Sequence, residues 1–335
     1  MKFLSLPTLI VVLCAGLIMI SIMAATDVID LQRFFNGDES ATSTLQNEYP
    51  QPAKLAEKLQ MGVVELNVAD LAAQQKYYQE LVGLEVLSED SSSVTLGFRD
   101  RAVIRLVASP QLPPQVQGSA GLYHSAIVFS SRATLAQAVQ RILERAPQYY
   151  SGTSDHVVSE AFYFVDPEGN GVELYYDKDP ASWRWRGGSV EMGSEYIDPE
   201  QYIKTYANTS AGEEKKMGHV HLKVGDIEQA KSFYESVLGL AVTSQMPTAL
   251  FMSDGKYHHY LGMNVWESPR AGMRTPSLGL KSFEIFVPDA ERLTELKARL
   301  TAASISFTET DKKVEVEDPW GTVVLITVNE AVFSE

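Results

Sequence analysis

The sequence predicts an α+β fold made of four similar modules, each consisting of a β-strand, an α-helix and three further β-strands. The main observation is an internal repeat. VELNVADLAAQQKYYQELVGLEVL, which begins at Val64, aligns without a gap with VHLKVGDIEQAKSFYESVLGLAVT, which begins at Val220, at an offset of 156 residues. A weaker pair, DPEGNGVELYY from Asp166 and DPWGTVVLITV from Asp318, combines a Pro-Gly turn with a strand pattern. Repeats of this kind indicate one supersecondary unit each.

Within each strong repeat, the elements follow in a fixed order. An alternating apolar strand leads to an aspartate, Asp70 or Asp226, that can cap the next helix through its side-chain oxygen. The amphipathic helix ends near Leu-Gly, where Gly83 or Gly239 can adopt the left-handed conformation that terminates a helix. Further strands complete the module.

The two halves of the repeat define the domain organisation. We expect modules at about 58–109, 119–178, 215–268 and 278–330. The domain boundaries that follow are an N-terminal apolar segment 1–25, a linker 26–57, a first domain 58–182, a linker 183–214 and a second domain 215–330. The second linker is recognised by its Gly-Gly, Asp-Pro and Glu-Glu-Lys-Lys sequences.

Composition limits the possible partners. The chain has 335 residues, of which 45% are hydrophobic and 21% charged, as in ordinary globular proteins. Its formal net charge of -15 argues against a nucleic-acid partner, because nucleic-acid backbones attract basic surfaces. The single cysteine, Cys14, excludes a disulfide framework and a zinc-thiolate site. Any metal must therefore be bound by nitrogen and oxygen. A homo-oligomer is compatible with the sequence.

The N-terminus carries an apolar run without charge, residues 3–25, which is long enough to cross a bilayer. Lys2 precedes it, and Asp27 and Asp30 follow, which favours an N-terminus inside and an exported body, periplasmic or extracellular. No good small-x-small cleavage site precedes Thr26, so we expect a membrane anchor. Secretion after signal cleavage is the alternative.

The stretch MGHVHLKVGD, residues 217–226, places two histidines on one face of a strand. Because side chains alternate with period two, His219 and His221 share a face, while valines and a leucine form the other. The apolar face predicts the core. The histidine face predicts either a functional cavity or solvent.

The complete pattern resembles a known superfamily. A strand, an Asp, a helix with FY and LGL, and a later DP-x-GN-x-x-E are similar to the vicinal oxygen chelate proteins: glyoxalases, extradiol dioxygenases and antibiotic-resistance proteins. DHVVSEAFYFVDPEGNGVELYYDKD, MGHVHLKVGDIEQAKSFYESVLGL and KYHHYLGMNVW are closer still to catechol 2,3-dioxygenases of the bacillary four-module type. The resemblance covers about residues 58–330 and implies that the modules form paired half-barrels.

The resemblance also implies a metal site. In this superfamily the ligands come from the first strand of one module and from the first and last strands of its partner. The matching residues here are His124, Glu173 and His219. The corresponding positions in modules one and four hold Val63, Ser282 and Leu325, which cannot replace them. Two imidazoles and one carboxylate suit Fe(II), with Mn(II) as an alternative. Modules two and three should therefore pair, and modules one and four should form a metal-free companion.

Further site residues follow from the same resemblance. Extradiol enzymes have an acid-base histidine in the module of the first ligand, and a histidine and a tyrosine before the carboxylate, here His156 and Tyr163. KYHHYLGMNVW offers His258 or His259. Strand alternation places His259 on the apolar face of Leu261, Met263 and Val265, and it places His258, Tyr260 and Asn264 on the cavity face. We therefore expect His258 as the acid-base residue, His259 as its support, and His221, Tyr260 and Asn264 as substrate contacts.

The implied reaction is the opening of a catechol ring by O2 next to its two hydroxyls, giving a muconic semialdehyde. Two other functions remain open. A glyoxalase or epimerase would need a fourth metal ligand from the last strand of module three, where the sequence has Asn264. A small-molecule binding protein of the resistance type would use the same fold without a metal.

Overall fold

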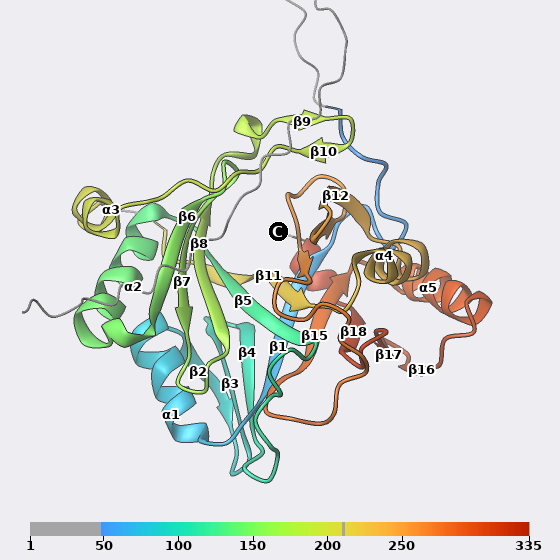
Figure 1. The fold of residues 1–335 in the computed structure, drawn as a ribbon, viewed down its shortest axis with the longest axis horizontal. Coiled ribbons are helices and arrows are strands. Elements are labelled where there is room, and N and C mark those ends of the chain that lie inside the picture. The colour runs from blue at the N-terminus through green and yellow to red at the C-terminus, as the bar shows by residue number, and fades with distance from the viewer. Residues whose placement is uncertain (1–47, 210–211, 335) are drawn as a thin grey trace, which may run out of the picture. The chain divides into compact units, whose positions relative to one another are not determined.

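Two eight-stranded sheets form the framework of the protein (Figure 1). The computed structural model describes residues 48–209 and 212–334, which belong to one compact unit, Asn47–Glu335. We call the two sheets the site sheet and the companion sheet. In the site sheet the order is β12-β13-β14-β11-β5-β8-β7-β6. In the companion sheet it is β16-β17-β18-β15-β1-β4-β3-β2.

Each sheet combines strands from both halves of the sequence. The strands of the site sheet are β5 (Gly121–Phe129), β6 (Tyr150–Asp155), β7 (Ser159–Val165), β8 (Gly171–Asp177), β11 (Lys215–Lys223), β12 (Ala241–Met246), β13 (Ala249–Ser253) and β14 (Leu261–Asn264). Those of the companion sheet are β1 (Gln60–Val68), β2 (Glu85–Glu89), β3 (Ser93–Phe98), β4 (Arg101–Ala108), β15 (Gly279–Val287), β16 (Phe307–Thr310), β17 (Lys313–Glu317) and β18 (Val323–Val328). The prediction that modules two and three pair, leaving one and four as the companion, is confirmed. So is the fold of four modules in two curled half-barrel sheets.

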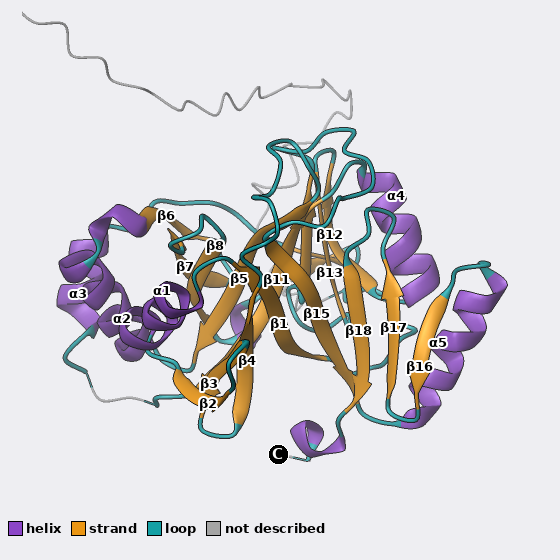
Figure 2. Ribbon diagram, turned by 90° about the horizontal axis from the view of Figure 1, so that it is seen from below, coloured by secondary structure: helices purple, strands orange, loops and turns teal. Residues whose placement is uncertain are grey.

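Helices cover the outside of the strands (Figure 2). The α-helices are α1 (Leu71–Lys76), α2 (Arg132–Arg145), α3 (Pro199–Tyr206), α4 (Ile227–Lys231) and α5 (Ala290–Ala302). Two π-helical segments, η2 (Tyr77–Val82) and η5 (Ser232–Leu238), continue α1 and α4. Short 3₁₀ turns are η3 (Pro147–Tyr149), η4 (Pro180–Ser182) and η6 (Glu330–Phe333). Modules one and three therefore share a change from α-helix to π-helix, which the apolar pattern of the sequence did not predict.

The predicted caps are present at both strong repeats. Asp70 accepts a hydrogen bond from the backbone N–H of Ala73, and Asp226 does the same for Gln229. At the other end, Gly83 and Gly239 have φ angles of 86° and 90°, a conformation that residues with a Cβ rarely adopt. These local signals fix where the helices begin and end.

Buried tyrosines tie neighbouring modules together. The hydroxyl of Tyr78 donates to Asp166 Oδ2 at 3.3 Å, and that of Tyr234 donates to Asp318 Oδ2 at 2.9 Å. Both aspartates begin the turn before the last strand of their module. Each bond connects a helix of one module to the turn of the next, so the repeat is visible in its polar core as well as in its strands.

The segment 183–214, predicted as a linker, carries a small hairpin of β9 (Trp185–Arg186) and β10 (Ser189–Val190), followed by α3. Trp183, Trp185 and Val190 are buried together with Val158. This segment therefore packs against the site sheet. The domain boundaries themselves stay a prediction.

The described residues contain no helix that is long and apolar enough to cross a membrane. The predicted anchor, residues 3–25, lies outside the described residues, as does most of the predicted linker 26–57.

Candidate metal centre

Three neighbouring strands bring the predicted ligands together. β5 lies between β11 and β8, and its residues His124 and Ala126 face His221 and Glu173 respectively in the two pairings. As a result, His124 Nε2 lies 2.9 Å from Glu173 Oε2, and His219 Nε2 lies 3.3 Å from the same oxygen. The two Nε2 atoms are 3.3 Å apart. All three side chains are buried, and their ligand atoms lie within 4.8 Å of one another.

The electrostatics of this cluster suit a cation. Burial alone would raise the pKa of Glu173, but the two imidazoles hold this pKa well below its usual value, so the side chain is a carboxylate. Burial lowers the pKa of His219, which keeps its imidazole neutral. An ionised carboxylate and neutral imidazoles are the forms that bind metals. A divalent cation would offset the charge of this buried carboxylate.

The donor set fits the predicted class of metal. Two imidazole nitrogens and one carboxylate oxygen, with no sulfur, form the ligand set typical of non-haem Fe(II) sites with open positions. His219 Nδ1 is buried and has no hydrogen-bond partner among the described residues. The Nε2 atoms of both histidines point to the common centre, so Nδ1 of His219 is the nitrogen left over when the ring binds an ion through Nε2.

His221 lies beside this cluster, in an aromatic wall. Its ring centroid is 4.9 Å from that of His124 and 5.0 Å from that of Tyr123. Asn264 accepts the backbone N–H of Trp266 through Oδ1, so its amide nitrogen donates to His221 Nε2 at 2.9 Å. Burial holds the pKa of His221 well below its usual value, which agrees with a neutral ring that accepts this bond.

Tyr123 and Trp266 were not predicted as site residues. Their rings lie 5.5 Å apart, and each also contacts His221. Trp266 is half exposed, so this pair forms the outer part of the wall. Strand alternation assigns Tyr123 to the face opposite His124, and for this reason no sequence pattern marked Tyr123 as a site residue.

His156 and Tyr163 form a hydrogen-bonded pair on the other side of the cluster. His156 Nδ1 lies 2.8 Å from the carbonyl of Gly193, which can only accept, so Nδ1 carries a proton. His156 Nε2 lies 2.6 Å from the Tyr163 hydroxyl. Burial, followed by the charge of Glu173, raises the pKa of Tyr163 well above its usual value, so its hydroxyl stays protonated. The Tyr163 ring is 5.6 Å from that of His124.

The double histidine differs from the expectation. Strand β14 begins only at Leu261, so the alternation that placed His259 on an apolar face does not extend to it and does not decide which of the two histidines faces the cavity. The segment before β14 instead bends, and the His259 ring centroid lies 4.3 Å from that of His219, against 6.3 Å for His258. Burial holds the pKa of His259 well below its usual value. Tyr260 stacks on Tyr257 at 4.6 Å.

His258 is directed to the end of β8. Its Nδ1 lies 2.8 Å from Nδ1 of His259, and its Nε2 lies 2.7 Å from Asp177 Oδ1. Asp177 was not predicted. A signal existed, because Glu173, Tyr175 and Asp177 are spaced by two and share one face of β8.

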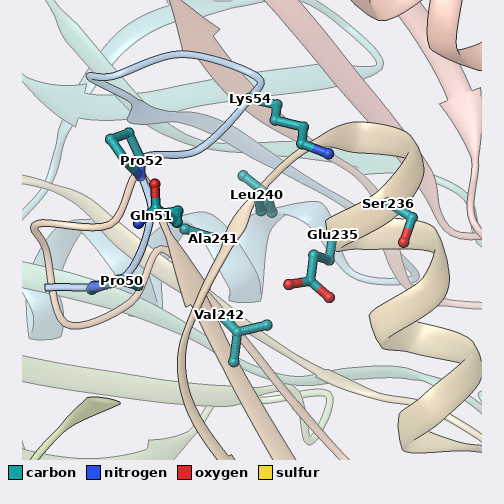
Figure 3. Close-up of a pocket in the computed structure, with 9 residues that line it drawn as sticks. All are labelled: Pro50, Gln51, Pro52, Lys54, Glu235, Ser236, Leu240, Ala241 and Val242. Carbon is teal, nitrogen blue, oxygen red and sulfur yellow. The ribbon is translucent and has the colours of Figure 1, made fainter. Parts of the chain in front are cut away.

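Two hollows of the surface lie away from these residues. One, of about 370 Å³, is lined by residues that include Pro50, Pro52, Lys54, Glu235, Ser236 and the start of β12 (Figure 3). None of the predicted site residues lines it. The chemistry of the buried donors therefore identifies the candidate site better than the size of a surface hollow.

Comparisons with known proteins identify the family of the chain. The family model described as "Glyoxalase/Bleomycin resistance protein/Dioxygenase superfamily" matches residues 60–174 and 216–326. A Bacillus subtilis (strain 168) protein named catechol-2,3-dioxygenase is 32% identical over 278 residues, which cover 78% of this chain and 95% of that protein.

Solved structures show the same fold at lower identity. A candidate dioxygenase from Bacillus subtilis has a TM-score of 0.57 and 12% identity, covering 80% of this chain and 84% of the other. Glyoxalase I from Zea mays has a TM-score of 0.51 and 16% identity, covering 83% of this chain and 95% of the other. The two structures have different activities in their names, so the fold alone does not select a reaction.

Proposed function

Because the chain belongs to the glyoxalase, bleomycin resistance protein and dioxygenase superfamily, we propose that it is an extradiol dioxygenase. Its substrates would be catechol or a substituted catechol and O2, and its product a muconic semialdehyde. The observation that carries the proposal is the convergence of His124, Glu173 and His219 beside a third imidazole, His259. The Bacillus subtilis relative named catechol-2,3-dioxygenase supports the substrate class.

The three converging residues would bind Fe(II), with Mn(II) as the alternative. When bound, such an ion supplies open positions for both oxygens of the diol and for O2, and a path for electrons between them. The ligand set agrees with this role because its donor atoms, from adjacent strands of the site sheet, lie within 4.8 Å of one another. The rest of the reaction depends on the groups around it.

His259 is the residue that we propose for acid-base work, in place of His258. Its ring contacts that of His219, and it is neutral at pH 7 because burial lowers its pKa. A neutral imidazole within reach of the substrate can accept a proton from one hydroxyl of the diol. His258 lies farther from the metal ligands and is bonded to Asp177.

On the opposite side, Tyr163 and His156 would orient the substrate. The Tyr163 hydroxyl is a protonated donor close to Glu173 and His124. Tyr123, His221 and Trp266 offer aromatic faces against which a planar ring can pack. Asn264 holds His221 in place, and Tyr260 would act only through its stack on Tyr257.

A glyoxalase or epimerase reaction has less support. It would need a fourth ligand, and the residue available on β14 is Asn264. Both polar ends of its amide are already bonded, to His221 and to the backbone of Trp266. A metal-free binding function would leave the convergence of His124, Glu173 and His219 without a role.

The test is metal analysis of the full-length protein purified without oxygen, followed by O2 uptake with catechol. We expect about one iron per chain and consumption of catechol and O2 in equal amounts. Absence of a stoichiometric metal would overturn all metalloenzyme functions together. Bound metal without O2 uptake on any simple catechol would leave the glyoxalase-type alternative.

We also propose that residues 3–25 anchor the protein in a membrane with its body exported, and that secretion after cleavage is the alternative. The proposal rests on the uncharged length of this segment and on its flanking charges. Membrane fractionation and N-terminal sequencing of the mature protein distinguish the two. Recovery of the uncleaved chain in the soluble fraction would contradict both.

A further inference from the structure

A chain of hydrogen bonds leads away from the candidate site through His259. His259 Nδ1 and His258 Nδ1 are 2.8 Å apart, and His258 Nε2 lies 2.7 Å from Asp177 Oδ1. The other carboxylate oxygen, Oδ2, accepts from the Tyr257 hydroxyl at 2.7 Å. The hydroxyls of Tyr257 and Tyr175 are 2.8 Å apart. These contacts connect a buried imidazole to a carboxylate whose side chain is 23% exposed.

The chemistry of the partners decides where the protons lie. A carboxylate only accepts hydrogen bonds, so His258 Nε2 must donate to Asp177. With His258 neutral, its other nitrogen has a lone pair, and His258 Nδ1 accepts from His259 Nδ1. The proton of neutral His259 is therefore on Nδ1. Its Nε2 has a free lone pair, as a general base requires.

The surroundings of His258 prevent its ring from turning. The side chain is fully buried, with the Tyr257 ring centroid at 4.1 Å and that of Trp183 at 5.1 Å. Trp183 comes from the segment 183–214, which covers this side of the site. Burial, followed by the charge of Asp177, raises the pKa of Tyr257 well above its usual value, so that its hydroxyl is a permanent donor.

We propose that Asp177 and His258 are positioning residues that hold His259 in the tautomer with a free Nε2. The pair acts without touching the substrate, because Asp177 fixes His258 and His258 in turn fixes His259. Only the effect on turnover rests on the proposed function. The arrangement of protons is a property of the chain and can be measured without metal.

The measurement is a long-range ¹⁵N–¹H correlation spectrum of full-length protein, metal-free, with ¹⁵N-labelled histidine rings. The chain has six histidines, so each signal can be assigned by single substitution. We expect His259 protonated at Nδ1 only and His258 at Nε2 only. A His259 proton on Nε2, or a His258 ring protonated at both nitrogens, would overturn the proposal.

Asp177→Asn tests the cause. Because Tyr257 donates, the asparagine should turn its oxygen to Tyr257 and its NH₂ group to His258 Nε2. His258 must then donate through Nδ1, and the proton of His259 must move to Nε2, where it blocks the base. We expect this tautomer change in the spectrum and a fall in kcat of about 10- to 100-fold in the metal-loaded enzyme, with KM little changed. An unchanged His259 tautomer in folded Asp177→Asn would contradict the mechanism.

A second substitution should restore the His259 tautomer and kcat in Asp177→Asn, a recovery that a purely structural role of Asp177 does not predict. In Asp177→Asn with Tyr257→Phe, the hydroxyl that orients the asparagine is gone, so its oxygen can face His258 again. We expect the His259 proton to return to Nδ1 and kcat to recover severalfold. If neither the His259 tautomer nor kcat recovers, the proposed positioning of His259 by Asp177 and His258 is contradicted. Asp177→Glu, which keeps a carboxylate, should keep the His259 tautomer of the unsubstituted protein. This variant provides the test if Asp177→Asn does not fold, and a changed His259 tautomer in it would contradict the proposal.

Glu160→Gln is the matched control. Glu160 also lies in the site sheet and accepts from a cation and a tyrosine, with Arg132 Nε at 2.7 Å and the Tyr202 hydroxyl at 3.0 Å. It has no bond to the histidine pair, so its substitution should cost stability and leave the His259 tautomer unchanged. If the protein lacks metal or dioxygenase activity while His259 shows the expected tautomer, the proposed function fails and the positioning inference stands.

Discussion

The site sheet and the companion sheet have equivalent strand orders, yet only one of them brings metal-binding atoms together. Each is centred on an antiparallel pair, β11 with β5 in the site sheet and β1 with β15 in the companion, and each pair is flanked by parallel partners. At the three ligand positions the companion has Val63, Ser282 and Leu325. The fold therefore supplies the positions, and the side chains decide whether a position has a function.

The side chains next to the ligand positions also differ between the two sheets. Two residues beyond His124, the site sheet has Ala126, a small side chain. The equivalent residue of the companion, Glu284, extends a carboxylate that accepts from the Thr327 hydroxyl at 2.6 Å and from the Val63 N–H at 3.4 Å. Lys281 and Glu65 form an ion pair on the same strand pair. The polar groups of the companion satisfy one another, whereas those of the site sheet leave a carboxylate and two imidazoles for an ion.

The largest expected effect comes from making the site sheet resemble its companion. Glu173→Leu inserts the residue found at the equivalent position, Leu325. Because the site loses its only charged ligand, we expect no bound metal and no detectable ring cleavage, measured by metal analysis and O2 uptake. His124→Ala and His219→Ala should also lose metal. The reverse change, Leu325→Glu, should create no second site, since Val63 and Ser282 offer no ligand; a second equivalent of iron would contradict this comparison.

The next effect separates the ligands from the acid-base residue. His259→Ala should keep its metal and lose about 10²- to 10⁴-fold in kcat, because a general base contributes to rate without holding the ion. His258→Ala should also keep metal and lose less. If His258→Ala abolishes turnover while His259→Ala retains it, the assignment from strand alternation is right and the one proposed from the structure is wrong.

The histidines also predict how stability depends on pH. His219, His221 and His259 have pKa values lowered by burial, so the unfolded chain binds more protons than the folded one below pH 6.5. Stability should therefore fall as pH drops from 7 to 5, by up to about 1.4 kcal/mol per pH unit for each histidine. The pKa of Glu173 is lowered below 4.5, so its contribution is lost only at lower pH. Urea unfolding of EDTA-treated protein measures this, and His221→Gln should flatten the curve.

The smallest effect is expected in the companion sheet. Glu284→Gln should leave metal content and kcat unchanged and cost about 1 kcal/mol, the scale of one hydrogen bond. Urea unfolding and O2 uptake on the same sample check both parts. A loss of activity without loss of stability would mean that the companion takes part in the function, and the contrast between the two sheets would no longer hold.

Much of this molecule follows from local sequence. The capping aspartates Asp70 and Asp226 and the glycines Gly83 and Gly239 lie where the patterns predict, because they depend on interactions within a few residues. The ligand set could be named because the resemblance to the superfamily gives the strand positions of its ligands, and these positions can be counted in this sequence. Local patterns did not predict two features: the π-helical turns that follow α1 and α4, and the position at which β14 begins.

The arrangement of the histidines around the candidate ligands depends on tertiary contacts, which no local sequence pattern contains. His258 and His259 lie in a bend, where alternation does not determine direction, so only packing against His219 and Asp177 separates their roles. Gly193 and Trp183 come from a segment that reads as a linker, and they contact His156 and His258 only in the folded chain. The sequence alone determined the four modules and their caps, because these depend on short-range periodicity, and its resemblance to the superfamily named the three candidate ligands. The tertiary structure decided which imidazole is beside the ligands and which is bonded to Asp177, because that choice depends on groups about 80 residues apart that meet only when the sheets close.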